Sequence, residues 1–252
     1  MILQILKAGL TKVMARFFIF CFVLWPVAGG ANNDLTYIAH AGGGYKGLHY
    51  TNSLEALDEN YRKGFRFFEI DLMMTRDGKL ICAHGEWKGL QPSYEELQQQ
   101  RANLPYKICT GEELVSWFKG HQDAYLITDI KQPAKRIQIL KWLAEQKIVK
   151  QVIPQIYFPH EYRGVRELGY ENIILTLYFY NKEPESLLDF LQSKKLYALT
   201  MSVELVRQGA AIKLKGNYPI YTHTVNNCAD ARKLRKLGIS GIYTDFINPG
   251  KC

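Results

Sequence analysis

Residues 68–84 read Phe-Glu-Ile-Asp-Leu-Met-Met-Thr-Arg-Asp-Gly-Lys-Leu-Ile-Cys-Ala-His, and the fold of the chain can be worked out from them. The first half is largely apolar and predicts a buried β-strand, yet it carries Glu69 and Asp71. Side chains two residues apart on a strand point to the same side, with Cα atoms roughly 6.5 Å apart. Two carboxylates this close repel each other and are costly to desolvate. A divalent cation bound between them offsets both costs.

The second half of the stretch predicts a hairpin that returns toward these acids. Asp77-Gly78 is a strong tight-turn signal, and residues 79–83 run back as a mostly apolar segment that ends at His84. The hairpin therefore carries an imidazole toward the two carboxylates. A pair of metal-ligating acids and a titratable base in one short stretch suggest phosphate chemistry.

The rest of the chain alternates between strand and helix patterns. Helices are expected at 54–63, 93–100, from 110, and at 134–147, 160–168, 184–194, 203–214 and 227–237. The eight expected strands are 35–39, 66–72, 124–130, 152–156, 172–177, 196–200, 218–223 and 240–244. This pattern predicts an α/β protein, a (β/α)8 TIM barrel with a small β-hairpin and an irregular insertion, residues 85–109, after strand two. An open doubly wound sheet is the alternative, but the sequence has no Gly-rich dinucleotide fingerprint.

A barrel of this kind gathers polar side chains at the carboxyl ends of its strands, where active sites form. The residues at these ends are His40, Glu69, Asp71, Asp129, Lys131, His223 and Asp245. Two assignments stay open: His223 fits a hydrogen-bonded structural role equally well, and Asp245 fits a turn or helix cap. Gln155 and Tyr157 end strand four and line either the cleft or the barrel core.

These residues occur in motifs that resemble those of the glycerophosphodiester phosphodiesterases. The motifs are His40-x-Gly42, Asn52-Ser53-x-x-Ala56, Gly64, Glu69-x-Asp71, Thr75-x-Asp77-Gly78, His84, Asp129-x-Lys131, Thr224-Val-Asn226 and Gly241-Ile-Tyr-Thr-Asp245. They cover nearly the whole chain after its first 31 residues, in order and with suitable gaps. The related phosphatidylinositol-specific phospholipases C and sphingomyelinases D share the barrel and the paired histidines.

The resemblance implies a role for each matching residue. His40 and His84 would be the general acid and base, and Glu69, Asp71 and Asp129 would hold one divalent cation, Ca²⁺ or Mg²⁺. Lys131 would contact the phosphate. The substrate would be a small-molecule or lipid phosphodiester whose own neighbouring hydroxyl attacks, giving a cyclic phosphate that water then opens. His223 is a further candidate for substrate contact.

The sequence departs from the family pattern at several positions. Ala41 stands where the family usually has Arg, so a charge-assisted contact to phosphate is missing, and Lys46 is the candidate to replace it. Asp129 replaces the usual Glu, as in the sphingomyelinase D branch. Tyr50-Thr51 replaces Pro-Glu, and Gly85 replaces the Asp that is common after the second histidine.

The first 31 residues differ from the rest of the chain. Three basic residues precede the apolar run 17–27, and small residues follow it at 28–31, a pattern typical of a secretory signal peptide cleaved before Asn32. An uncleaved N-terminal membrane anchor is the alternative. Both predict an exported protein, periplasmic or secreted, in which residues 32–252 form the barrel domain.

Charge and cysteine content narrow the choice of partners. Without residues 1–31 the chain keeps 29 Lys and Arg against 24 Asp and Glu, a net charge of +5. This balance suits an anionic substrate or peripheral contact with an anionic membrane. No nucleic acid is expected, because basic residues never run longer than two and no nucleic-acid motif occurs. Four cysteines remain, Cys82, Cys109, Cys228 and Cys252, and they allow three complete disulfide pairings.

The sequence is compatible with three functions. The first is a metal-dependent hydrolase of soluble glycerophosphodiesters, which releases an alcohol and glycerol phosphate. The second is a lipid-directed phospholipase C or sphingomyelinase D-like enzyme, which predicts an exposed apolar surface near residues 85–109. The third is a non-catalytic barrel that binds phosphate or lipid but lost turnover together with the arginine.

Overall fold

A computed structural model describes residues 35–85, 91–178, 184–214 and 218–252, which belong to one compact unit, Asp34–Cys252. The predicted leader, residues 1–31, lies outside the described residues. The strands are β1 (Thr36–Ala39), β2 (Phe67–Met74), β3 (Leu80–Cys82), β4 (Tyr125–Ile130), β5 (Val152–Ile156), β6 (Ile174–Thr176), β7 (Ala198–Ser202), β8 (Ile220–His223) and β9 (Gly241–Thr244). Eight of them pair in parallel, and β1 closes the ring by pairing with both β2 and β9. The predicted (β/α)8 barrel is confirmed.

The hairpin predicted after strand two is also present. Strand β3 pairs with the end of β2 in antiparallel register, with Leu72 opposite Cys82 and Met74 opposite Leu80. The turn between them is closed by Gly78, whose φ of 80° lies in the left-handed region that glycine adopts without strain. The hairpin extends β2 beyond the barrel, so that the chain after β3 returns to the carboxyl ends of the strands.

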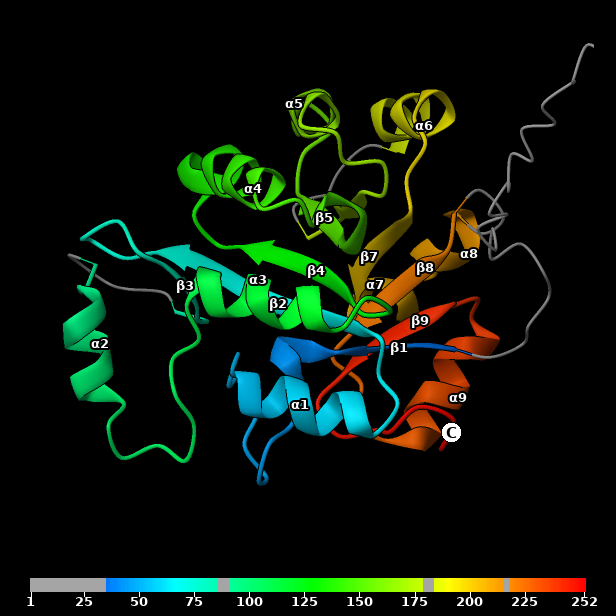
Figure 1. The fold of residues 1–252 in the computed structure, drawn as a ribbon. Helices are drawn as coiled ribbons and strands as arrows, with labels where there is room; N and C mark the ends of the chain where they lie inside the picture. Colours follow the sequence, from blue (N-terminus) through cyan, green and yellow to red (C-terminus); the bar gives the residue numbers. More distant parts are fainter. Residues whose placement is uncertain (1–34, 86–90, 179–183, 215–217) are drawn as a thin grey trace, which may run out of the picture. The chain divides into compact units, whose positions relative to one another are not determined.

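Helices surround the barrel and follow the expected ranges closely. They are α1 (Leu54–Arg62), α2 (Tyr94–Gln100), α3 (Gly111–Gly120), α4 (Arg136–Glu145), α5 (Glu161–Glu167), α6 (Pro184–Ser193), α7 (Val203–Arg207), α8 (Ala210–Leu214) and α9 (Cys228–Lys236). Figure 1 shows α2 set apart from the helices that pack on the sheet. This short helix belongs to the insertion that the sequence predicts after strand two.

One predicted helix, 203–214, is wrong as a single element. It is divided into α7 and α8 because Gly209 adopts a φ of 87°, which ends α7. Other boundaries agree well with the sequence signals. The Ser53 side chain accepts the Ala56 N–H at the start of α1, and Thr110 and Glu113 form a capping box at the start of α3, where the sequence predicts a helix from 110.

The barrel interior explains why polar residues meet at its mouth. Inward-facing side chains from successive strands form one buried apolar cluster: Ile38, Ile127, Ile153, Ile174, Ala198, Tyr221 and Tyr243. Two residues further along, the same inward faces carry polar side chains. Ile38 is followed by His40, Ile127 by Asp129, and Tyr221 by His223. Side chains on a strand alternate with a period of two. The inward face of these strands therefore has an apolar residue in the barrel core and, two positions later, a polar residue at the carboxyl end.

The four cysteines divide into one disulfide and two thiols. Cys228 and Cys252 are bonded, whereas Cys82 and Cys109 are free and buried. The Cys82 N–H donates to the Cys109 carbonyl at 2.8 Å, so the hairpin and the segment before α3 are joined by backbone bonding. No helix within the described ranges combines the length and the hydropathy that a membrane span needs.

Candidate active site

A cavity of about 310 Å³ opens at the carboxyl ends of the strands. Most of the predicted site residues line it: His40, Glu69, His84, Asp129, Lys131 and His223. A second cavity of about 320 Å³ lies between the β2–β3 turn and α4, and none of the predicted site residues lines that one. Most of the predicted site residues therefore lie together in the cavity at the barrel mouth.

Three buried carboxylates converge at this cavity: Glu69 and Asp129 line it, and Asp71 lies next to them. Glu69, Asp71 and Asp129 each offer one oxygen, and these oxygens lie within 4.8 Å of one another. Burial and the charge of Asp71 raise the pKa of Glu69 to about 8. Burial and the charge of Asp129 likewise raise the pKa of Asp71. Three converging hard oxygen donors fit a Ca²⁺ or Mg²⁺ ion, whose charge would relieve their mutual repulsion.

The loop after β1 fixes the orientation of two of these carboxylates. The Ala41 N–H donates to Glu69 Oε2 at 2.8 Å. Asn52 donates through Nδ2 to Asp71 Oδ2 and accepts the Asp71 N–H at Oδ1, both at 2.9 Å. Ala41 and Asn52 reach these positions with φ values of 49° and 50°, which are uncommon outside glycine. The loop therefore holds Glu69 and Asp71 in place through hydrogen bonds.

Asp129 is held by two side chains from β4 and β5. Lys131 Nζ lies 2.6 Å from Asp129 Oδ2 and 3.5 Å from Asp71 Oδ1, and the Tyr157 hydroxyl donates to Asp129 Oδ1. Burial lowers the pKa of Lys131, but the charges of Asp129 and Asp71 outweigh it and raise the pKa overall. Lys131 therefore remains a cation beside the carboxylates, where an anionic phosphate would meet it.

His40 is oriented by Asp245, an acid whose role the sequence left open between the active site and a turn or helix cap. Its Nδ1 donates to Asp245 Oδ1 at 2.8 Å, which leaves Nε2 on the cavity side, 4.0 Å from Glu69 Oε2. Burial lowers the pKa of His40, but the hydrogen bond to Asp245 and the charge of Glu69 outweigh this effect and raise it. A carboxylate bonded to one ring nitrogen fixes the tautomer and directs the other nitrogen toward its target.

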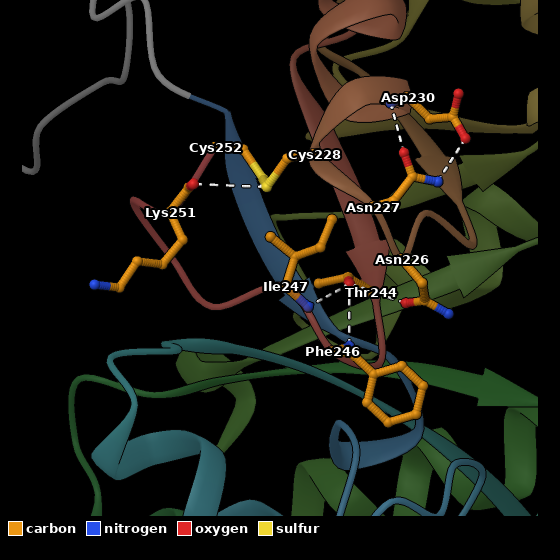
Figure 2. Close-up of a disulfide and its surroundings, with 9 residues drawn as sticks. All are labelled: Asn226, Asn227, Cys228, Asp230, Thr244, Phe246, Ile247, Lys251 and Cys252. Carbon is orange, nitrogen blue, oxygen red and sulfur yellow. Dashed lines mark hydrogen bonds between the residues drawn. A yellow bond between two sulfur atoms is a disulfide. The ribbon is translucent and has the colours of Figure 1, made fainter.

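Asp245 is in turn held by Asn226. The Asn226 Nδ2 donates to Asp245 Oδ2, and the Asn226 Oδ1 accepts the Asp245 N–H, both at 2.8 Å. Thr244 adds a hydroxyl bond to Asn226 at 3.1 Å, and Figure 2 shows these two side chains meeting beside α9. Asn226 and Asp245 both belong to motifs that resemble the family pattern. The sequence therefore pointed to these residues, but it did not show that Asp245 contacts His40.

His84 and His40 both contact the ring of Tyr50. The Tyr50 ring centroid lies 4.6 Å from that of His40 and 4.8 Å from that of His84. The hairpin places His84 here because the Ala83 N–H donates to the Asp71 carbonyl at 2.9 Å. The predicted return of the imidazole toward the carboxylates is therefore present in the structure.

The remaining predicted residues, His223 and Lys46, differ in position. His223 lies in the cavity wall, 4.7 Å from the Tyr178 ring centroid, and burial with the nearby charge of His40 lowers its pKa to about 4. Lys46 lies instead in an exposed turn, with Nζ 5.2 Å from the Tyr45 ring centroid, and it is not among the residues lining the cavity. Its position does not favour Lys46 as the replacement for the missing arginine.

Comparisons with known proteins match this geometry. The sequence profile of the Glycerophosphoryl diester phosphodiesterase family matches residues 42–249. The chain is 25% identical to a glycerophosphodiester phosphodiesterase of Bacillus subtilis (strain 168), over 89% of this chain and 90% of that protein. Among solved structures, a glycerophosphodiester phosphodiesterase of Thermotoga maritima is 20% identical, with a TM-score of 0.64 over 84% of this chain and 94% of that one.

A phosphodiesterase of Oleispira antarctica, solved in complex with the product sn-glycerol-3-phosphate, is 19% identical with a TM-score of 0.64 over 84% of this chain and 94% of that one. These structures share the barrel fold with the chain. The family profile, in contrast, spans most of the sequence, from shortly after β1 to beyond β9. The chain therefore belongs to the glycerophosphoryl diester phosphodiesterase family and is a phosphoric diester hydrolase.

Proposed function

We propose that this enzyme hydrolyses glycerophosphodiesters at the barrel-mouth cavity, with His40 and His84 as its acid–base pair and one divalent cation as cofactor. The observation that carries the proposal is the position of both imidazoles on one tyrosine ring beside three converging carboxylates. The product bound to the Oleispira antarctica relative, sn-glycerol-3-phosphate, supports a glycerophosphodiester as substrate.

Each side chain has a defined task in this mechanism. A Ca²⁺ or Mg²⁺ ion held by Glu69, Asp71 and Asp129 would withdraw charge from the phosphate. Lys131 offers a second positive contact close to the same oxygens. Of the two imidazoles, one takes the proton of the attacking hydroxyl and the other gives a proton to the leaving oxygen. Asp245 holds His40 so that Nε2, rather than Nδ1, exchanges this proton.

A lipid-directed activity is the second candidate, and one observation favours it. Leu48, Phe158 and Phe246 are exposed large apolar side chains on loops that follow β1, β5 and β9, around the cavity mouth. Leu104, in the predicted insertion, is exposed as well. Such side chains would contact acyl chains if the phosphodiester belonged to a lipid at a membrane surface.

We further propose that the enzyme works outside the cytoplasm. The leader-like residues 1–31 motivate this proposal, and the Cys228–Cys252 disulfide supports it, because such bonds persist mainly in oxidising compartments. Fractionation of cells that express the full chain tests it. Recovery of the protein in the cytoplasmic fraction alone would exclude export.

The catalytic proposal is tested by assaying the purified enzyme on glycerophosphocholine, on a lysophospholipid and on phosphatidylinositol vesicles. Each assay is run with Ca²⁺, with Mg²⁺ and with a chelator. We expect metal-dependent release of glycerol phosphate from the soluble diester, and a loss of about 100-fold or more in kcat/KM for His40→Ala and His84→Ala.

His160→Ala is the matched control, because His160 stacks on Phe158 and does not line the cavity. Hydrolysis of the two lipids with none of glycerophosphocholine would favour the lipid-directed candidate. Metal binding without turnover of any of the three substrates would overturn the catalytic proposal and favour a binding barrel. Full activity in the presence of chelator would exclude the cation.

A further inference from the structure

An anionic phosphate needs hydrogen-bond donors, and the backbone N–H and the ammonium groups nearest the carboxylates do not supply a free one. The Ala41 side chain offers none, and its N–H is already bonded to Glu69. The Lys131 ammonium is shared between Asp129 and Asp71. Lys46 is not among the lining residues. The contact that the family's arginine usually makes must therefore come from another group, or be absent.

Tyr50 meets the requirements for such a group. Its ring lines the cavity and contacts the imidazoles of His40 and His84, with ring centroids 4.6 and 4.8 Å away. Within the part of the chain that the structure describes, the Tyr50 hydroxyl has no hydrogen-bond partner. Burial and the charge of Asp245 raise the pKa of this phenol, so it keeps its proton at neutral pH. The hydroxyl is a free donor in the middle of the acid–base machinery.

The backbone holds Tyr50 in an uncommon conformation to reach this place. Its φ is 55°, in the left-handed region that bulky residues rarely adopt. The segment is secured immediately afterwards, because the Asn52 N–H donates to the Ala41 carbonyl at 3.0 Å and the Asn52 side chain holds Asp71. Backbone strain of this kind persists where the surrounding structure enforces it, and it is concentrated at functional sites.

We propose that the Tyr50 hydroxyl donates a hydrogen bond to a non-bridging oxygen of the substrate phosphate, while its ring packs against both imidazoles. Tyr50 thus makes a phosphate contact in place of the arginine that Ala41 replaces. This inference rests on the proposed function of the same cavity, and it names the residue that recognises the phosphate.

Two variants separate the hydroxyl from the ring. Tyr50→Phe removes only the hydroxyl, and we expect kcat/KM on glycerophosphocholine to fall about 10- to 100-fold, as for a lost bond to a charged group. The pH profile should keep its shape, because the ring remains. Tyr50→Leu also removes the ring, and it should further change the pH profile because both imidazoles lose an aromatic packing partner.

Tyr45→Phe is the matched control, since Tyr45 lies in the same loop but does not line the cavity. It should keep wild-type kcat/KM. Thermal unfolding of each variant shows whether its loop still folds. A Tyr50→Phe enzyme with wild-type kcat/KM would overturn the proposal, as would a loss of the same size in Tyr45→Phe.

Calorimetric binding of sn-glycerol-3-phosphate keeps the two proposals distinguishable. If the wild type bound this phosphate ester but hydrolysed no diester, the proposed function would fail while the Tyr50 contact could still be measured. We expect Tyr50→Phe to weaken this binding about 10-fold or more, and Tyr45→Phe to leave it unchanged. Equal affinity of wild type and Tyr50→Phe would overturn the inference independently of turnover.

Discussion

Asp245 illustrates how a single residue acquires its role from a partner far away in sequence. In the sequence it is an acid directly after the last strand, which fits a turn or a helix cap as well as an active site. In the barrel, β9 and β1 are neighbours, so Asp245 lies beside His40 although 205 positions separate them. The hydrogen bond between them determines which nitrogen of His40 faces the cavity.

Removing this charge should impair catalysis without unfolding the protein. Asp245→Asn retains a group of similar shape, but it can present an N–H to His40 Nδ1 and no longer stabilises a proton there. We expect kcat/KM on glycerophosphocholine to fall about 100-fold or more, because the imidazole then favours the wrong tautomer. Steady-state kinetics measure this loss, and circular dichroism shows that the fold persists.

Asp230→Asn is the matched control for this substitution. Asp230 is also bonded to an asparagine side chain, Asn227, but at the exposed start of α9, as Figure 2 shows. The same chemical change there should leave kcat/KM unchanged. Wild-type kinetics in Asp245→Asn would show that His40 does not depend on this acid.

At this scale the sequence predicted that the acids and histidines lie together, because their placement follows from strand periodicity and from the hairpin. Their roles in catalysis and metal binding stay predictions. Glu69 and Asp71 had to share a face, and the hairpin had to return His84. The contacts of Tyr50 and Tyr157 could not be predicted. They depend on loop backbone angles and on which strand ends meet across the barrel, and neither is encoded in local spacing.

At the scale of elements, hydrogen bonds join the loop after β1 to strand β2. Asn52 joins them with two bonds to Asp71, one to the carboxylate and one to the backbone N–H. The side chain is almost fully buried, at 1% exposure, so water cannot replace these bonds. Its φ of 50° adds a backbone requirement to the side-chain requirement.

Substituting Asn52 separates these two requirements. Asn52→Gly loses the two bonds but accepts the positive φ, and it should lower the free energy of unfolding by about 2–4 kcal/mol. Asn52→Ala loses the bonds and is also strained, so it should cost about 1 kcal/mol more. Urea unfolding followed by circular dichroism measures both. Equal stability of wild type and Asn52→Gly would mean that the two hydrogen bonds of Asn52 do not contribute to the free energy of unfolding.

The elements themselves were largely predictable because apolar runs and cap residues are local signals. Ser53, Thr110 and Glu113 cap the helices that the sequence assigned to them. The break at Gly209 was missed, since a glycine inside a helical pattern is often tolerated and only tertiary packing decides whether the helix ends.

At the scale of the whole molecule, closure of the barrel converts eight separate strand ends into one site. Strand β1 lies between β9 and β2, so His40 meets Asp245 on one side and Glu69 on the other. The alternation of strand and helix predicted this architecture. The disulfide pairing was not predictable, because it depends on where the chain after β9 runs relative to α9.

That pairing leads to a prediction about the stability of the protein and the number of its free thiols. The Cys228–Cys252 bond joins residues 24 positions apart, which should stabilise the fold by about 3 kcal/mol through the unfolded chain. Reduction should therefore lower the Tm by about 5–10 °C. Cys82 and Cys109 are buried, so neither should react with a thiol reagent in the native protein.

After denaturation without reductant, the same reagent should count two thiols, those of Cys82 and Cys109. The count also tests the leader, because Cys21 lies within residues 1–31 and would add a third thiol if that segment were retained. A Cys228→Ser, Cys252→Ser double variant is the matched control: it should keep two thiols and lose the effect of reductant on Tm. A count of four in the exported wild type would mean that the disulfide is absent, and the support it gives to an oxidising compartment would be lost with it.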